Sequence, residues 1–145
     1  MPAKILRFIR LAGEERSLFI QGCLISIKYA VITTLFPMRC YTNKLGFKGN
    51  ESSYSINEND LLIAKRVEKA MRRVQKYFPW KVKCFTAALT AKTILKKNNI
   101  PSTIYLGVKR SSDDKMLAHA WLRCGNIIVT GKEEMGNFTS LVFFS

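Results

Sequence analysis

The sequence predicts one α+β domain in which helices come first and an antiparallel sheet follows. Apolar residues recur at helical spacing up to about residue 97, whereas beyond Pro101 they alternate with polar residues, as in strands. A length of 145 residues is typical of one domain, and 48% hydrophobic residues suffice for a core. We therefore expect a single domain over residues 1–145, with a helical N-terminal segment over 1–50 and a core over 55–145.

The N-terminal segment is expected to hold a short helix near residues 6–10 and a longer one over 14–35. The apolar stretch 18–37 contains Gln21, Gly22 and Lys28, and a lysine at the centre of a spanning helix would cost about 2.5 to 3.5 kcal/mol. We therefore expect a mostly covered helix of a soluble domain, with no membrane span and no signal peptide. The polar residues 44–55 are expected to form a linker within the domain.

Two further helices are predicted over residues 55–78 and 84–97. The first opens with a Ser55-Ile-Asn-Glu58 sequence typical of a capping box and ends at Pro79. The second begins at Cys84 and ends in an Asn-Asn pair before Pro101.

Alternating segments predict strands over residues 102–109, 116–124, 127–130 and 138–144. The polar run 110–115 is a turn, and Gly125-Asn126 is typical of a tight hairpin. In a two-residue hairpin Cys124 pairs with Ile127, and His119 with Lys132.

The positive charge is concentrated in one part of the chain. The net charge is +14, and residues 65–97 hold eleven basic residues and one acid. Such a patch indicates an acidic partner, or else a solvated helix face. We place the candidate docking patch at Arg72, Arg73 and Lys76, and we expect no nucleic-acid partner because the sequence carries none of the usual motifs.

The four cysteines are far apart and form no C-x-x-C pair, which argues against a zinc site and against a disulfide framework. We therefore expect reduced thiols in the cytoplasm and no metal.

Cys84 and His119 are the candidate catalytic pair. The start of a helix presents unpaired N–H groups that stabilise a thiolate, so Cys84 lies where a nucleophile would be activated. His119 is the only histidine and stands between two alanines on a predicted strand, where it could act as general base. A cysteine that starts a helix and a histidine on a following strand form the arrangement of papain-like and transglutaminase-like sites.

Residues 84–131, with CFTAALTAKTILKK, IPSTIYLGV and LAHAWLRCGNIIVTG, resemble the transglutaminase-like leader peptidases of lasso peptide biosynthesis, in their small stand-alone form. The resemblance implies that Cys84 is the nucleophile and His119 the base of a cysteine protease. It implies removal of the leader from a ribosomally made precursor peptide, with a separate leader-recognition protein and a macrolactam synthetase as partners. It implies no cofactor and leaves an ATP requirement open.

The sequence departs from this family at the residue that orients the histidine. Members often have an aspartate about a dozen residues after the histidine, and Gly131 stands there. In the expected hairpin Glu134 lies diagonally on the histidine's face and is our candidate third member. Asn126 is the runner-up, although it sits in the turn, and a dyad with a backbone orienter is a further alternative.

Two tryptophans are candidates for lining or shielding the site, although such tryptophans more often belong to the core. Trp121 would share a strand face with His119, and Trp80 precedes Cys84 by four residues. The competing function is a noncatalytic basic module that binds an acidic protein or nucleic acid. A third option is acyl transfer in place of hydrolysis.

Overall fold

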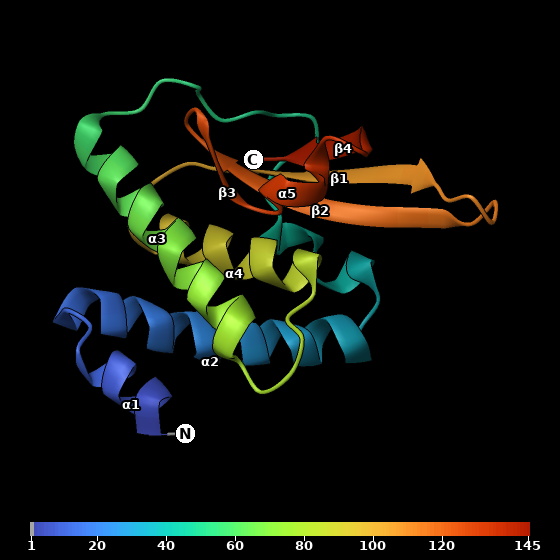
Figure 1. Ribbon diagram of the computed structural model, residues 1–145. Coiled ribbons are helices and arrows are strands. Elements are labelled where there is room, and N and C mark those ends of the chain that lie inside the picture. The colour runs from blue at the N-terminus through green and yellow to red at the C-terminus, as the bar shows by residue number, and fades with distance from the viewer. Residues whose placement is uncertain (1) are drawn as a thin grey trace.

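The computed structural model describes residues 2–145 and confirms the α+β class. Helices α1 and α2 lead through two 3₁₀ turns to α3 and α4, and a four-stranded antiparallel sheet follows, interrupted by the short helix α5 (Figure 1). The bounds are α1 Pro2–Ile9, α2 Gly13–Leu35, η1 Met38–Cys40, η2 Thr42–Lys44, α3 Glu58–Tyr77, α4 Cys84–Lys97, β1 Thr103–Arg110, β2 Met116–Cys124, β3 Ile127–Thr130, α5 Lys132–Met135 and β4 Thr139–Phe144.

The sheet has the strand order β3-β2-β1-β4 and packs on α4. Figure 1 shows α4 between the sheet and α2, with α3 crossing both helices. Helix α4 is therefore the centre of the molecule, and a run of its residues from Thr86 to Lys92 is buried. Its position fixes where its first residue, Cys84, lies relative to the sheet.

Helix α3 starts one turn later than the sequence predicts. Its N-cap is Asn57, whose side chain accepts a hydrogen bond from the backbone N–H of Asp60 at 2.8 Å. The expected capping box on Ser55 is therefore wrong, because the helix begins later and Asn57, two residues on, is its cap. Val67, Met71 and Val74 bury the inner face of the helix.

Helices α2 and α4 are joined by small residues and hydroxyl groups. Ser26 contacts Thr90 at 3.2 Å, and Tyr29 contacts Thr93 at 2.7 Å, in each case between side-chain oxygens. A Cβ on Gly22 would lie 2.8 Å from a methyl group of Val74, so only glycine allows α2 to approach α3 this closely. These contacts fix one face of α2 against the core.

The opposite face of α2 is exposed, so the prediction of a mostly covered helix is wrong. Only 22% of its most apolar 18-residue window is buried. Apolar residues occur on both faces of the helix, but the described part of the chain supplies packing partners for one face only. By length and composition α2 could cross a membrane, and it is the one such helix in the described chain.

The polar stretch expected as a linker is held firmly to the sheet. Arg123 of β2 is buried and donates hydrogen bonds to the carbonyl oxygens of Ser52 and Gly125, each at 2.7 Å. Its Nε also donates to the hydroxyl of Tyr105 at 3.0 Å. Burial, with a hydrogen bond to Glu51, raises the pKa of Tyr105 to about 12. This network covers the sheet face away from α4.

The last part of the chain differs from the expected hairpin. Cys124 pairs with Ile127 as predicted, but the register then shifts, so that Leu122 pairs with Thr130. β3 ends there, and the expected pair of His119 with Lys132 is wrong, because Lys132 begins α5. The helix α5 was not predicted, since four residues are too few to show helical periodicity.

Candidate functional site

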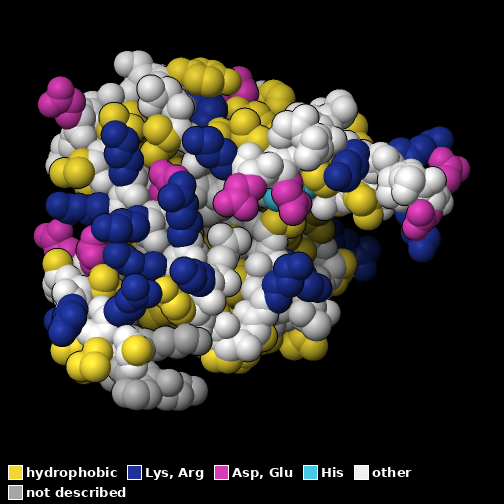
Figure 2. Space-filling model, viewed as in Figure 1, with side chains coloured by type: hydrophobic (Ala, Val, Ile, Leu, Met, Phe, Trp, Pro, Cys, Tyr) yellow, Lys and Arg dark blue, Asp and Glu magenta, His cyan; other side chains and the backbone are white. Residues whose placement is uncertain are grey.

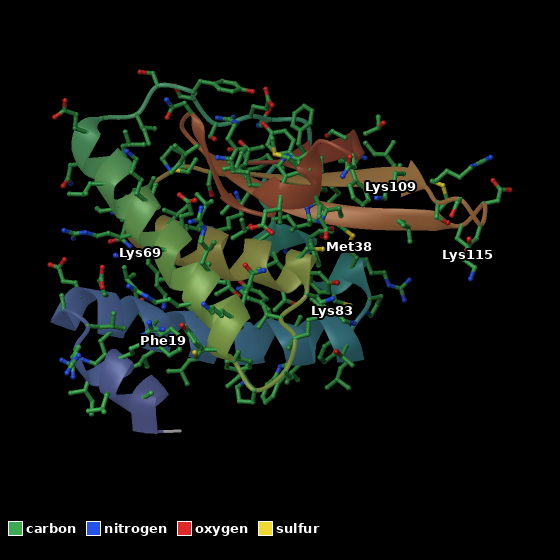
Figure 3. All side chains as sticks on the ribbon, viewed as in Figure 1. Phe19, Met38, Lys69, Lys83, Lys109 and Lys115 are labelled. Carbon is green, nitrogen blue, oxygen red and sulfur yellow. The ribbon has the colours of Figure 1, made fainter. Side chains whose placement is uncertain are left out.

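Cys84 is the first residue of α4, as the sequence predicts. Lys83, labelled in Figure 3, is the N-cap, and within the described chain no side chain caps this end of the helix. The first N–H groups of α4 therefore have no partner in their own helix and are available to an anion. The thiol is half-buried and not disulfide-bonded. Burial raises the pKa of two other thiols, those of Cys23 and Cys124.

His119 lies on β2 and is only 6% exposed. Its Nε2 is 2.9 Å from the carbonyl oxygen of Gly131. Because a carbonyl can only accept, Nε2 carries the proton in this contact. In the neutral ring, Nδ1 is then the unprotonated nitrogen, the one able to accept a proton.

Gly131 can hold this position because it has no side chain. Its φ is +77°, in the left-handed region, where the chain turns from β3 into α5. A Cβ would lie 2.5 Å from the carbonyl oxygen of Ala120 and 3.0 Å from His119 Nε2. Gly131 thus presents its backbone oxygen to the histidine.

Glu134 lies beside His119, although the pairing used to place it was wrong. Helix α5 brings its carboxylate to 3.8 Å from His119 Nδ1, and its side chain is 70% exposed. This separation is too long for a hydrogen bond. Asn126 is exposed in the β2–β3 turn.

Aromatic rings surround the imidazole. Trp121 stacks on His119 with ring centroids 5.9 Å apart, and Phe138, which follows α5, lies 5.1 Å from it. Trp121 also stacks on Tyr105 at 5.5 Å and is buried. It therefore shares the histidine's face, as predicted, and shields the ring from water. Trp80 is half-exposed in the α3–α4 loop and packs edge-on against Phe78.

The structure packs α4 against β2 but does not join the two candidate residues by a hydrogen bond within the described chain. Ala120 and Leu122 face the core that β2 shares with α4, whereas His119 and Trp121 alternate onto the other face. Transfer of a proton from Cys84 to His119 therefore requires the imidazole or the start of α4 to move.

The basic patch is partly neutralised within the chain. Arg72 pairs with Glu68 at 2.6 Å and Arg73 with Glu15 at 3.2 Å, while Lys76 lies over the ring of Tyr77. Figure 2 shows lysine and arginine side chains gathered over α3, with acidic side chains among them.

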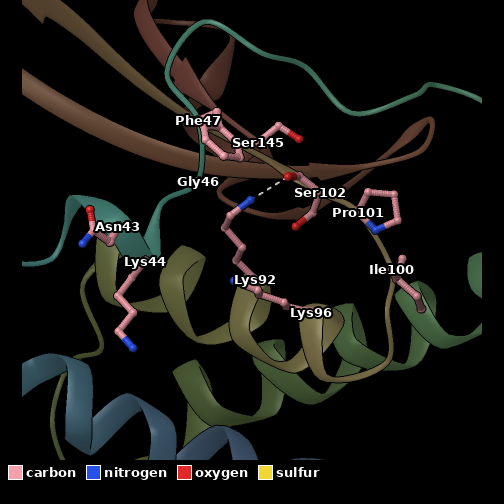
Figure 4. Close-up of a pocket in the computed structure, with 10 residues that line it drawn as sticks. All are labelled: Asn43, Lys44, Gly46, Phe47, Lys92, Lys96, Ile100, Pro101, Ser102 and Ser145. Carbon is pink, nitrogen blue, oxygen red and sulfur yellow. Dashed lines mark hydrogen bonds between the residues drawn. The ribbon is translucent and has the colours of Figure 1, made fainter.

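A cavity of about 620 Å³ lies near the C-terminal end of α4, away from Cys84 (Figure 4). Lys92 crosses it to donate a hydrogen bond to the carbonyl oxygen of Ser102 at 2.6 Å. Burial lowers the pKa of Lys92 to about 8. The ammonium of Lys44, another lining residue, points away from Lys92. Within residues 2–145 no group of three potential metal ligands comes together.

Residues 30–142 match the family model of the transglutaminase-like superfamily, and the chain belongs to this superfamily. The match includes Cys84, His119 and Gly131. The superfamily includes cysteine peptidases and acyltransferases. No significant match was found among curated proteins or among solved structures.

Proposed function

We propose that this protein is a cysteine peptidase in which Cys84 is the nucleophile and His119 the general base. The observation that carries the proposal is the match to the transglutaminase-like superfamily over residues 30–142. Within the matched region Cys84 is the first residue of α4, and the carbonyl oxygen of Gly131 contacts Nε2 of His119. Thiol chemistry of this kind requires neither a metal nor a cofactor.

In the proposed reaction His119 Nδ1 takes the thiol proton, and the thiolate attacks the scissile carbonyl carbon. The free N–H groups at the start of α4, that of Cys84 included, donate to the resulting oxyanion. His119 returns its proton to the leaving amine, and water then hydrolyses the thioester. The Gly131 carbonyl keeps Nε2 protonated throughout, which is the role that an aspartate has in related enzymes.

The proposed pair forms when substrate binds. Catalytic hydrogen bonds are often long in the free enzyme and tighten in the complex. Glu134 is the exposed group beside Nδ1, on the four-residue helix α5, so it is the side chain that must give way to the thiol. We assign Glu134 no orienting role, because it faces the nitrogen that has to accept the proton.

For the substrate, we propose the leader of a ribosomally made lasso peptide precursor. The support is the resemblance of residues 84–131 to the stand-alone leader peptidases. A separate leader-recognition protein and a macrolactam synthetase would then act with this chain in the cytoplasm. Four free cysteines agree with that compartment.

The test combines the chain with a matching precursor and recognition protein and follows cleavage by mass spectrometry. Cys84→Ala and His119→Ala should abolish cleavage, whereas Cys40→Ala, at an exposed cysteine on η1, should cut normally. Normal cleavage by Cys84→Ala would show that the mechanism is wrong. An added primary amine distinguishes acyl transfer, because it would be incorporated into the product.

A second measurement tests the pair without a substrate. Because no hydrogen bond joins the two groups in the free protein, the rate of alkylation of Cys84 should rise with pH at the same midpoint in the wild type and in His119→Ala. A lower midpoint in the wild type would contradict a pair that forms only with substrate, because an imidazolium already beside the thiol stabilises the thiolate.

The alternative function is a noncatalytic basic module. The ion pairs of Arg72 and Arg73 within the chain reduce the charge that such a module could offer a partner. If the patch docks an acidic partner protein, charge reversal at both positions should weaken assembly, and the binding should fall with salt. Unchanged assembly would exclude this use of the patch.

A further inference from the structure

Helix α2 carries a continuous apolar stripe on its exposed side. Ile20, Leu24, Ile27, Val31 and Leu35, which we name the α2 stripe, are between 39% and 69% exposed. At 3.6 residues per turn they fall within an arc of about 80°. Monomeric soluble proteins seldom expose a contiguous apolar surface unless it is an interaction site.

The stripe cannot turn inward, because the opposite side of α2 is fixed in the core. Gly22, Ser26 and Tyr29 are buried there, and the last two make side-chain hydrogen bonds to α4. Figure 1 shows α2 on the side of α4 that faces away from the sheet, so none of the strands covers it. Leu6 and Ile9 of the adjoining α1 are also more than half exposed.

Basic residues flank the stripe on both sides. Arg16 and Lys28 lie about 60° to either side of its centre on the helix circumference. The acids of α2 are directed elsewhere, since Glu14 pairs with Arg66 and Glu15 with Lys69 of α3. The surface around the stripe therefore combines exposed apolar side chains with positive charge.

We propose that the α2 stripe docks on an anionic lipid bilayer, with α2 lying in the plane of the interface. An apolar helix face with flanking lysine or arginine is the pattern of interfacial helices. A second copy of the chain fits less well, because each molecule carries a net charge of +14 and the flanking bases would face each other. The hydrogen bonds of α2 to α4 are retained when the helix lies flat and would be lost if it spanned the membrane.

The experiment is flotation of the full chain with vesicles of phosphatidylcholine alone or mixed equally with phosphatidylglycerol. The wild type should partition onto the mixed vesicles, and the double variant Leu24→Gln, Val31→Gln should partition about tenfold more weakly. The matched control is Leu62→Gln, Leu141→Gln, which removes two equally exposed leucines outside the stripe and should match the wild type. Replacing Arg16 and Lys28 by glutamine should weaken partition about fivefold or more and reduce its salt dependence.

Circular dichroism establishes that the variants are folded before partition is compared. The proposal is overturned if the wild type remains unbound with both the neutral and the anionic vesicles. It is likewise overturned if the stripe variant binds the anionic vesicles as strongly as the wild type does. It is also overturned if the wild type is a dimer by light scattering, the stripe variant is a monomer, and neither binds vesicles. In that case the stripe is an interface between two copies.

Discussion

Replacing Gly131 with alanine should release His119 from the carbonyl that orients it. Alanine at φ +77° costs about 1 to 2 kcal/mol. Its Cβ would also lie 2.5 Å from the Ala120 oxygen and 2.8 Å from the Trp121 Cβ, so the turn must shift. With overpacking included, the free energy of unfolding should fall by about 2 to 4 kcal/mol, as measured by urea denaturation.

The position of His119 can be measured directly because the chain has one histidine. In the wild type, nitrogen NMR of the neutral ring should show the proton on Nε2, as the Gly131 contact requires. In Gly131→Ala the proton should be shared between both nitrogens, and kcat/KM for precursor cleavage should fall about a hundredfold, since a displacement of about 1 Å is enough.

Glu134→Gln is the matched control, because it removes the other group beside the imidazole. Its carboxylate is mostly exposed, so stability should change by less than about 0.5 kcal/mol, and the proton should remain on Nε2. A wild-type proton on Nδ1, or loss of the Nε2 signal in Glu134→Gln alone, would refute the assignment of Gly131 as the orienting residue.

Three further predictions concern stability and thiol reactivity. Burial lowers the pKa of Lys92 to about 8 from 10.5, so at this residue the folded chain binds fewer protons than the unfolded chain between those pH values. The free energy of unfolding of the wild type should therefore rise with pH relative to that of Lys92→Met, by at most about 3 kcal/mol, and the same pH dependence in both proteins would contradict this. Asn57→Ala should lower the stability by about 1 kcal/mol in thermal denaturation, and no change would show that the cap is dispensable. Near neutral pH, iodoacetamide should modify Cys84 before Cys23 and Cys124, because burial raises the pKa of the latter two thiols. Mass spectrometry of the peptides gives the order of modification, and the reverse order would count against an activated Cys84.

Much of the fold follows from local signals in the sequence. Helix α4 has the predicted bounds, because its start after a proline-containing loop and its end in an Asn-Asn pair are both local features. β2 also has the predicted bounds, and the Gly125-Asn126 turn forms as expected. Cys84 and His119 were therefore placed correctly on a helix start and on a strand.

The surroundings of the site did not follow from local signals. β3 has the predicted bounds, but the register shift between Leu122 and Arg123 and the left-handed turn at Gly131 change the pairing beyond it. Helix α5 then brings Glu134 to the histidine by a different route. The sequence allowed a backbone group to orient His119 but did not indicate which carbonyl group does so. A carbonyl group is common to every residue, so only its position in space distinguishes it.

The sequence by itself determined the order of elements, the candidate nucleophile and base, and the absence of a side chain at position 131. Only the tertiary structure decided that Gly131 faces His119 Nε2, that α4 and β2 leave Cys84 without a hydrogen bond to His119, and that one side of α2 stays exposed. The physical reason is that periodicity reports which residues share a face of their own element. Which face meets another element depends on packing between segments that are distant in the chain.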